Sequence, residues 1–127
     1  MNILFNTTRV LLYLRKRLYA AFWQWYHTQY CLATKVKFTD RNSVIFNDHA
    51  IISINPNSDV VIGRAFIVNS GPESGIGSTM SKITVADDAT LKIGDYVGIS
   101  STTMLVNDSL IIGDHVNIGG GQFYYRQ

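Results

Sequence analysis

One seven-residue phrase recurs three times in this chain, and it constrains the fold more than any other feature. Each copy begins with Ile-Gly, continues with two mostly polar residues and an apolar residue, and has a β-branched aliphatic residue six positions after its first. The copies are Ile62–Val68, Ile93–Ile99 and Ile112–Ile118. Self-similarity at a fixed short period is the signature of repeat architectures. The sequence therefore predicts a hexapeptide-repeat solenoid.

Pairs of apolar or small residues two positions apart indicate short strands, because this spacing places both side chains on one face of a strand. The pairs are Leu91/Ile93, Val97/Ile99, Thr103/Leu105, Leu110/Ile112 and Val116/Ile118. We expect the core to contain Ile93, Ile99, Leu105, Ile112 and Ile118. The Gly, Asn, Asp and Ser residues between the pairs suit tight corners, since they reach positive φ or bond their own backbone. Exposed corners are expected at Asp95, Asn107 and Asp114.

The spacing of the copies sets the boundaries. The interval from Ile93 to Ile112 is three hexads plus a single extra position, whereas the interval from Ile62 to Ile93 is much longer. The surplus falls on a Gly-rich stretch and predicts a protruding loop near residues 70–82. We expect a helix and linker over residues 1–35, a parallel β-helix over residues 36–121 and an atypical tail over residues 122–127.

The segment Ile93–Gly121 resembles the hexapeptide-repeat acyltransferases, which include the galactoside, maltose, serine and polysaccharide O-acetyltransferases. It is most similar to the small sugar or exopolysaccharide acetyltransferases, and Asn69–Pro72 also fits that branch. The resemblance covers about residues 44–121. It implies an all-β solenoid in the form of a left-handed parallel β-helix. The hand is taken from the family, because parallel crossovers are otherwise right-handed.

The resemblance also implies a function. Members of the family transfer an acetyl group from acetyl-CoA, which is a co-substrate and not a tightly bound cofactor, to a hydroxyl of a sugar or polysaccharide precursor. Their active sites lie between neighbouring subunits of a homotrimer. The residues implied to lie nearest the acceptor are Asn107, Asp108, Gly119, Gly120 and Gly121.

The sequence departs from the family after its glycines. The family's general base is a histidine in a segment of the type Tyr-Asp-Thr-Asp-Phe-His, whereas here Gly121 is followed by Gln122–Gln127. We therefore expect an amino-terminal portion of an O-acetyltransferase, without turnover of its own. The alternative is a non-catalytic β-helix remnant that serves as a trimerisation or membrane-associating module.

No catalytic residue is assigned among the three histidines. His115 is the one candidate for a base, although its place beside Asp114 is typical of an exposed corner residue. His49 has a similar setting, and His27 lies in a helical segment. A histidine-ligated zinc site needs three ligands with a paired spacing, and these positions do not provide it. No metal site is expected.

The amino-terminal segment differs from the rest, because it contains no glycine or proline from Thr7 to about Tyr30. Its large apolar residues recur at helical spacing, namely Leu11, Leu14, Leu18, Phe22 and Trp25. The sequence predicts an amphipathic helix with two alternative roles. It could cap the β-helix or a neighbouring subunit. It could also contact a membrane peripherally through residues 9–26, whose basic residues suit anionic lipid.

Composition limits the cellular setting. A net charge of +2 is too small to indicate a nucleic-acid partner. The basic run Arg15–Arg17 interrupts the apolar stretch, so no membrane-spanning helix is expected. The single Cys31 fits a reducing compartment. We expect a cytoplasmic protein, with peripheral contact at the inner membrane face as the alternative.

Overall fold

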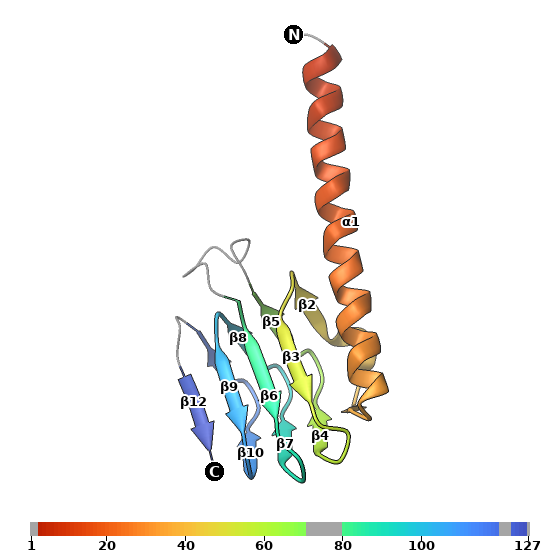
Figure 1. The fold of residues 1–127 in the computed structure, drawn as a ribbon. Coiled ribbons are helices and arrows are strands. Elements are labelled where there is room, and N and C mark those ends of the chain that lie inside the picture. Colours follow the sequence, from red (N-terminus) through yellow and green to blue (C-terminus); the bar gives the residue numbers. More distant parts are fainter. Residues whose placement is uncertain (1–2, 71–79, 120–122, 127) are drawn as a thin grey trace.

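A computed structural model of the protein describes the backbone of residues 3–70, 80–119 and 123–126, and the side chains of residues 7–70 and 80–119. The chain begins with one long helix, α1 (Ile3–Ala33), which starts earlier and ends later than the sequence pattern indicates. Short parallel strands follow it (Figure 1). The expected order of one helix followed by short parallel strands is therefore confirmed. Residues 71–79 of the loop predicted near residues 70–82 lie outside the described residues, as do residues 122 and 127 of the predicted tail.

The described residues form twelve strands of two to four residues. They are β1 (Lys37–Phe38), β2 (Ile45–Asn47), β3 (Ile51–Ile54), β4 (Asp59–Ile62), β5 (Ile67–Asn69), β6 (Lys82–Val85), β7 (Thr90–Ile93), β8 (Gly98–Ser100), β9 (Thr103–Val106), β10 (Ser109–Ile112), β11 (Asn117–Ile118) and β12 (Phe123–Arg126). One turn of 3-10 helix, η1 (Arg41–Ser43), lies between β1 and β2.

The strands form three four-stranded sheets, and each strand pairs with the strand three positions along the chain. Sheet A has the order β1-β4-β7-β10, sheet B the order β2-β5-β8-β11, and sheet C the order β3-β6-β9-β12. The chain thus visits the three sheets in turn. We call three consecutive strands, one from each sheet, a rung, so that β1–β3 are the first rung and β10–β12 the fourth.

The core consists of apolar side chains that repeat at equivalent positions in successive rungs. In sheet B, Phe46 pairs with Val68, Val68 with Ile99, and Ile99 with Ile118. All four side chains are buried. Sheet A repeats the pattern with Ile62, Ile93 and Ile112. Four of the five expected core residues are therefore found in the core, and their removal from water is the main stabilising contribution.

The prediction for β9 was wrong by one residue. Leu105 is only half-buried, whereas Met104 and Val106 are buried. The reason is the corner that precedes β9, where Ser101 adopts a φ of 47° and both Ser101 and Thr102 are buried. This corner takes up two inward-facing residues, and a shift of one residue moves every side chain of a strand to its other face.

The glycines of the repeated phrase do not serve the purpose that the sequence suggested. Positive φ falls two residues later, on Ala65, Tyr96 and His115, at 57°, 60° and 58°. Gly63 and Gly94 are required by close approach between rungs instead. A Cβ atom on Gly63 would collide with the carbonyl oxygen of Gly94, and a Cβ on Gly94 would collide with the Asp114 carboxylate.

Candidate functional site

The residues that the resemblance implies for the acceptor site lie at different corners of the stack. Asn107 and Asp108 form the exposed corner between β9 and β10. Gly119 follows β11 at the corner that leads toward sheet C, where a Cβ atom would lie 3.6 Å from Cβ of Ser100. Gly120 and Gly121 lie outside the described residues. The structure thus separates Asn107 and Asp108 from Gly119, and their role in acceptor binding stays a prediction.

His115 occupies an exposed corner of the fourth rung. Its ring stacks on the ring of Tyr96 from the rung before, with 5.1 Å between centroids and 7° between planes. Its backbone N–H donates to the carbonyl oxygen of Asp95 at 2.8 Å. None of the three cavities described below is lined by His115. The ring is thus placed as part of a stacked corner.

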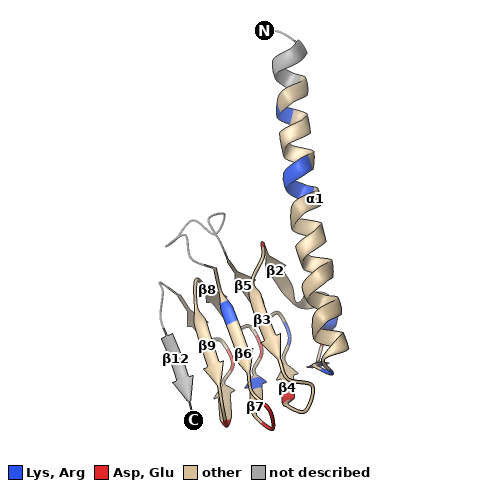
Figure 2. Cartoon of the chain, viewed as in Figure 1, with Lys and Arg blue, Asp and Glu red and all other residues tan. Residues whose placement is uncertain are grey.

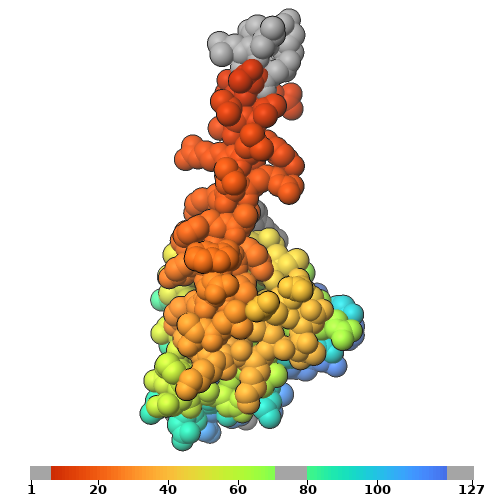
Figure 3. Space-filling model, turned by 90° about the vertical axis from the view of Figure 1, so that its right-hand side faces the viewer, coloured from red at the N-terminus to blue at the C-terminus, as the bar shows by residue number. Residues whose placement is uncertain are grey.

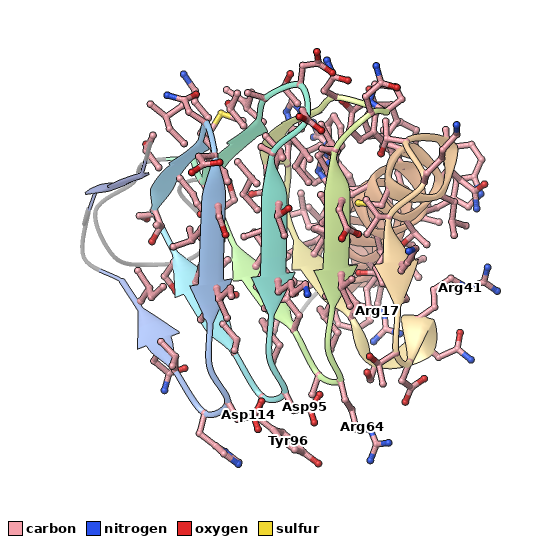
Figure 4. All side chains as sticks on the ribbon, turned by 90° about the horizontal axis from the view of Figure 1, so that it is seen from below. Arg17, Arg41, Arg64, Asp95, Tyr96 and Asp114 are labelled. Atoms are coloured by element: carbon pink, nitrogen blue, oxygen red, sulfur yellow. The ribbon has the colours of Figure 1, made fainter. Side chains whose placement is uncertain are left out.

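Asp95 and Asp114 hold neighbouring rungs together at this corner. The Asp95 carboxylate accepts a hydrogen bond from the backbone N–H of Arg64 at 2.8 Å. The Asp114 carboxylate accepts from the N–H of Asp95 at 2.7 Å. Figure 4 shows the three residues in a row along one edge of the stack. Asp95 was expected to be exposed, but it is half-buried because the next rung covers it. A carboxylate that accepts backbone hydrogen bonds in this way acts as a corner former.

A second row of polar side chains runs along the end of sheet B. The amide of Asn47 donates to the Asn69 side chain at 2.7 Å, and the amide of Asn69 donates to the Ser100 hydroxyl at 3.2 Å. This row borders an open cavity of about 320 Å³ between α1 and sheet B. The cavity wall consists of Lys16, Tyr19, Ala20, Asn47, Asp48, Asn69 and Ser70. The sequence pattern gives no sign of this row, because its members are unequally spaced along the chain and fit no single period.

Three side chains of α1 form hydrogen bonds with the backbone of the first rung, a role that the sequence pattern does not indicate. Gln24 donates to the carbonyl oxygen of Val44 at 2.8 Å and accepts from the N–H of Phe46 at 2.7 Å. Its amide therefore bonds β2 much as a neighbouring strand would. One turn later the N–H of Ala50 donates to Nε2 of His27 at 3.0 Å.

The third of these α1 side chains is Tyr30, whose hydroxyl accepts a hydrogen bond from the N–H of Ile54 at 3.0 Å. Gln24, His27 and Tyr30 are spaced by three, so they lie on one face of the helix. An uncovered sheet edge presents unpaired N–H and C=O groups that invite pairing with another chain. The helix thus covers the edge of the first rung, where Figure 3 shows it lying across the strands.

His27 is buried within an aromatic cluster. The rings of Trp23 and His49 stack with 3.9 Å between centroids, and the His27 ring lies 5.5 Å from that of His49. A smaller cavity of about 240 Å³ adjoins the cluster, between Tyr26 and Ile52. Burial lowers the pKa of His27 to about 4, and the neighbouring His49 contributes to this lowering. His27 is therefore neutral near pH 7 and acts as a hydrogen-bond acceptor through Nε2.

Cys31 belongs to the same buried face of α1. Its side chain is 1% exposed, and burial raises the pKa of the thiol to about 12. Because the thiolate is the reactive form, this cysteine is a packing residue and not a nucleophile.

A wider cavity between α1 and β2 is lined by Gln24 and Val44 among others. Within residues 7–70 and 80–119, no group of three or more His, Cys, Asp or Glu side chains could hold a metal ion.

The helix is also the only described element long enough to raise the question of a membrane crossing. In the part of the chain that the structure describes, no helix combines the length and the apolar character needed to cross a bilayer.

Comparisons with models of protein families, with curated proteins and with solved structures found no match to this chain. The repeated phrase and the geometry of the described residues are thus the observations that bear on function.

Proposed function

We propose that the chain is a left-handed parallel β-helix of the hexapeptide-repeat acyltransferase type. The observation that carries this proposal is the position of the repeated phrase. Ile62, Ile93 and Ile112 are the last residues of β4, β7 and β10, which are adjacent strands of sheet A. A glycine follows each of them at the same corner. A motif that returns to the same place in successive rungs supports a solenoid. The left hand comes with the resemblance.

By the same resemblance, we propose that the fold serves an enzyme that transfers an acetyl group from acetyl-CoA to a sugar or polysaccharide precursor. We propose that this enzyme is a cytoplasmic homotrimer. Within it, the described residues supply the scaffold. A general base needs a pKa near the working pH and reach to the hydroxyl that it deprotonates. His27 has neither, since it is buried and its pKa is low. His49 stacks on Trp23, and His115 stacks on Tyr96 at an exposed corner.

The test is the release of CoA thiol from acetyl-CoA by the purified chain, across a panel of sugar acceptors. A folded trimer with no release above background is expected. The matched variants are His115→Ala and His49→Ala, neither of which should alter the background rate. Turnover that His115→Ala abolishes would contradict the scaffold role and would make His115 the base. A folded monomer would contradict the trimeric arrangement that the proposal includes.

A further inference from the structure

The helix α1 presents two opposite faces. One face carries Gln24, His27 and Tyr30, which bond the first rung. The other carries an apolar row that we call the outer stripe. The outer stripe consists of Leu11, Leu14, Leu18, Phe22 and Trp25, whose side chains are 60%, 49%, 71%, 49% and 60% exposed. At 3.6 residues per turn the centre of this row lies about 180° around the helix from His27. Packing on the strands therefore cannot cover it.

Much of the outer stripe lies on the part of α1 that extends past the strands. Figure 1 shows the amino-terminal half of the helix projecting beyond β2 and β5, and Figure 3 shows the same half standing clear of the strands. Further exposed apolar side chains continue around this half, including Val10, Leu12 and Tyr19. A contiguous exposed apolar surface of this kind marks a site of interaction with another body.

The charge of the chain is divided between the two parts. The sequence up to Thr39 contains six Lys and Arg and no Asp or Glu, whereas the sequence after it contains five Lys and Arg and all nine acidic residues. In Figure 2 the basic residues of α1 lie along its projecting half, and acidic residues lie at the corners between strands. At 3.6 residues per turn Arg15 and Arg17 lie about 60° and 100° to either side of the centre of the outer stripe, whereas Lys16 lies on the strand-facing side, where it lines the cavity between α1 and sheet B.

This charge distribution decides between two bodies that could cover the stripe. If the helix of a second copy packed on it, parallel or antiparallel about Leu18, the Arg15 and Arg17 that flank the stripe on one helix would approach those of the other. Neither helix carries an acidic residue to compensate. Like charges placed on neighbouring helices are destabilising. A bilayer with anionic headgroups supplies an apolar interior for the stripe and negative charge for Arg15 and Arg17.

We infer that α1 docks in the plane of an anionic lipid surface, with the outer stripe at the acyl-chain boundary and the flanking Arg15 and Arg17 among the headgroups. Trp25 and Tyr26 are then at the depth that Trp and Tyr favour in membranes. Because the stripe and the His27 face are opposite, the rungs remain on the aqueous side. The inference does not depend on acyl transfer by the chain.

The experiment is co-sedimentation of the whole protein with vesicles of phosphatidylcholine, alone or with added phosphatidylglycerol. Binding is expected to the anionic vesicles, to weaken with added salt, and to shift Trp25 emission to shorter wavelength. Leu18→Ser should weaken binding about tenfold, because one exposed leucine no longer enters the bilayer. Its matched control is Ile111→Ser on β10, where Ile111 is 69% exposed.

Charge is tested in the same way. The double variant Arg15→Gln, Arg17→Gln should lose roughly fivefold in binding for each charge removed. Its matched control changes Arg41 and Arg64, which are exposed in the strand region, to Gln.

Two results would overturn the inference. One is equal binding to neutral and anionic vesicles. The other is an oligomer in lipid-free solution that Leu18→Ser dissociates, which would assign the stripe to a second copy. Thermal unfolding of each variant shows whether its fold is retained, and loss of binding by a folded Leu18→Ser but not by Ile111→Ser supports the docking surface.

Discussion

The two ends of the rung stack are treated differently by this chain. At the first rung, α1 places Gln24, His27 and Tyr30 on the backbone of β2, the following corner and β3. At the fourth rung, no residue that the structure describes lies over the corner of Gly113, where a Cβ atom would meet nothing within 4 Å. The same Ile-Gly phrase occurs in the second, third and fourth rungs. The difference shows that whether a glycine of this phrase can be substituted depends on the contacts with the neighbouring rung and not on the phrase itself.

The largest effect is expected from placing a charge in the core, and it should differ between the third rung and the fourth. Ile99 is 0% exposed between Val68 and Ile118, whereas Ile118 has a described partner only at Ile99. Ile99→Asp should unfold the protein, because an unpaired carboxylate buried between two rungs costs several kcal/mol. Ile118→Asp should cost clearly less. Chemical denaturation followed by circular dichroism measures both, and equal losses would remove the distinction between inner and outer rungs.

The second prediction concerns the first rung, which α1 covers, and the dependence of its stability on pH. Folded His27 has a pKa of about 4, and the unfolded residue titrates near its ordinary value of 6.5. Between these values the unfolded state binds a proton that the folded state does not, so stability falls as the pH falls through this window. The loss should reach up to about 3 kcal/mol near pH 4.

The matched variants separate this histidine from the others. His27→Gln should flatten the dependence of unfolding free energy on pH between 6.5 and 4, and His115→Gln, in the fourth rung, should leave it in place. The measurement is urea unfolding at a series of pH values. If His115→Gln removed the pH dependence of the unfolding free energy and His27→Gln retained it, His27 would not be the group responsible.

The smallest expected effect compares two glycines of the repeated phrase. Gly94→Ala should destabilise by about 2 kcal/mol, since the added methyl group meets the Asp114 carboxylate and the backbone of Gly113. Gly113→Ala should change stability by less than about 1 kcal/mol, or increase it slightly by restricting the unfolded chain. Melting temperatures of the two variants provide the comparison. Similar losses would mean that the glycines serve the corner itself and not the contact between rungs.

The repeat made much of the strand region predictable, because its apolar positions follow a period that burial imposes on every rung. It predicted the inward positions of Ile93, Ile99, Ile112 and Ile118, and it failed at Leu105, where the Ser101–Thr102 corner changes the phase. Corner length depends on how two rungs meet, which a local pattern does not contain.

The contacts of α1 could not be predicted from the sequence. Gln24 and His27 bond backbone groups 20 to 23 residues away. Backbone groups have no residue type, so the sequence carries no sign of such partners. For the candidate site, the sequence offered His115 and the implied acceptor residues. The structure places His115 on Tyr96 and separates Asn107 and Asp108 from Gly119.

The backbone bonds of Gln24, His27 and Tyr30 have a consequence for the order of folding. Strand partners lie far apart in sequence, as the pairing of Leu91 with both Val60 and Leu110 shows. No strand can pair with its later partner until the next three strands have been laid down, and each such closure costs entropy before any contact repays it. During synthesis α1 emerges first, so the first rung has a template before a second rung exists. We therefore expect assembly to proceed in one direction, each completed rung serving as the template for the next.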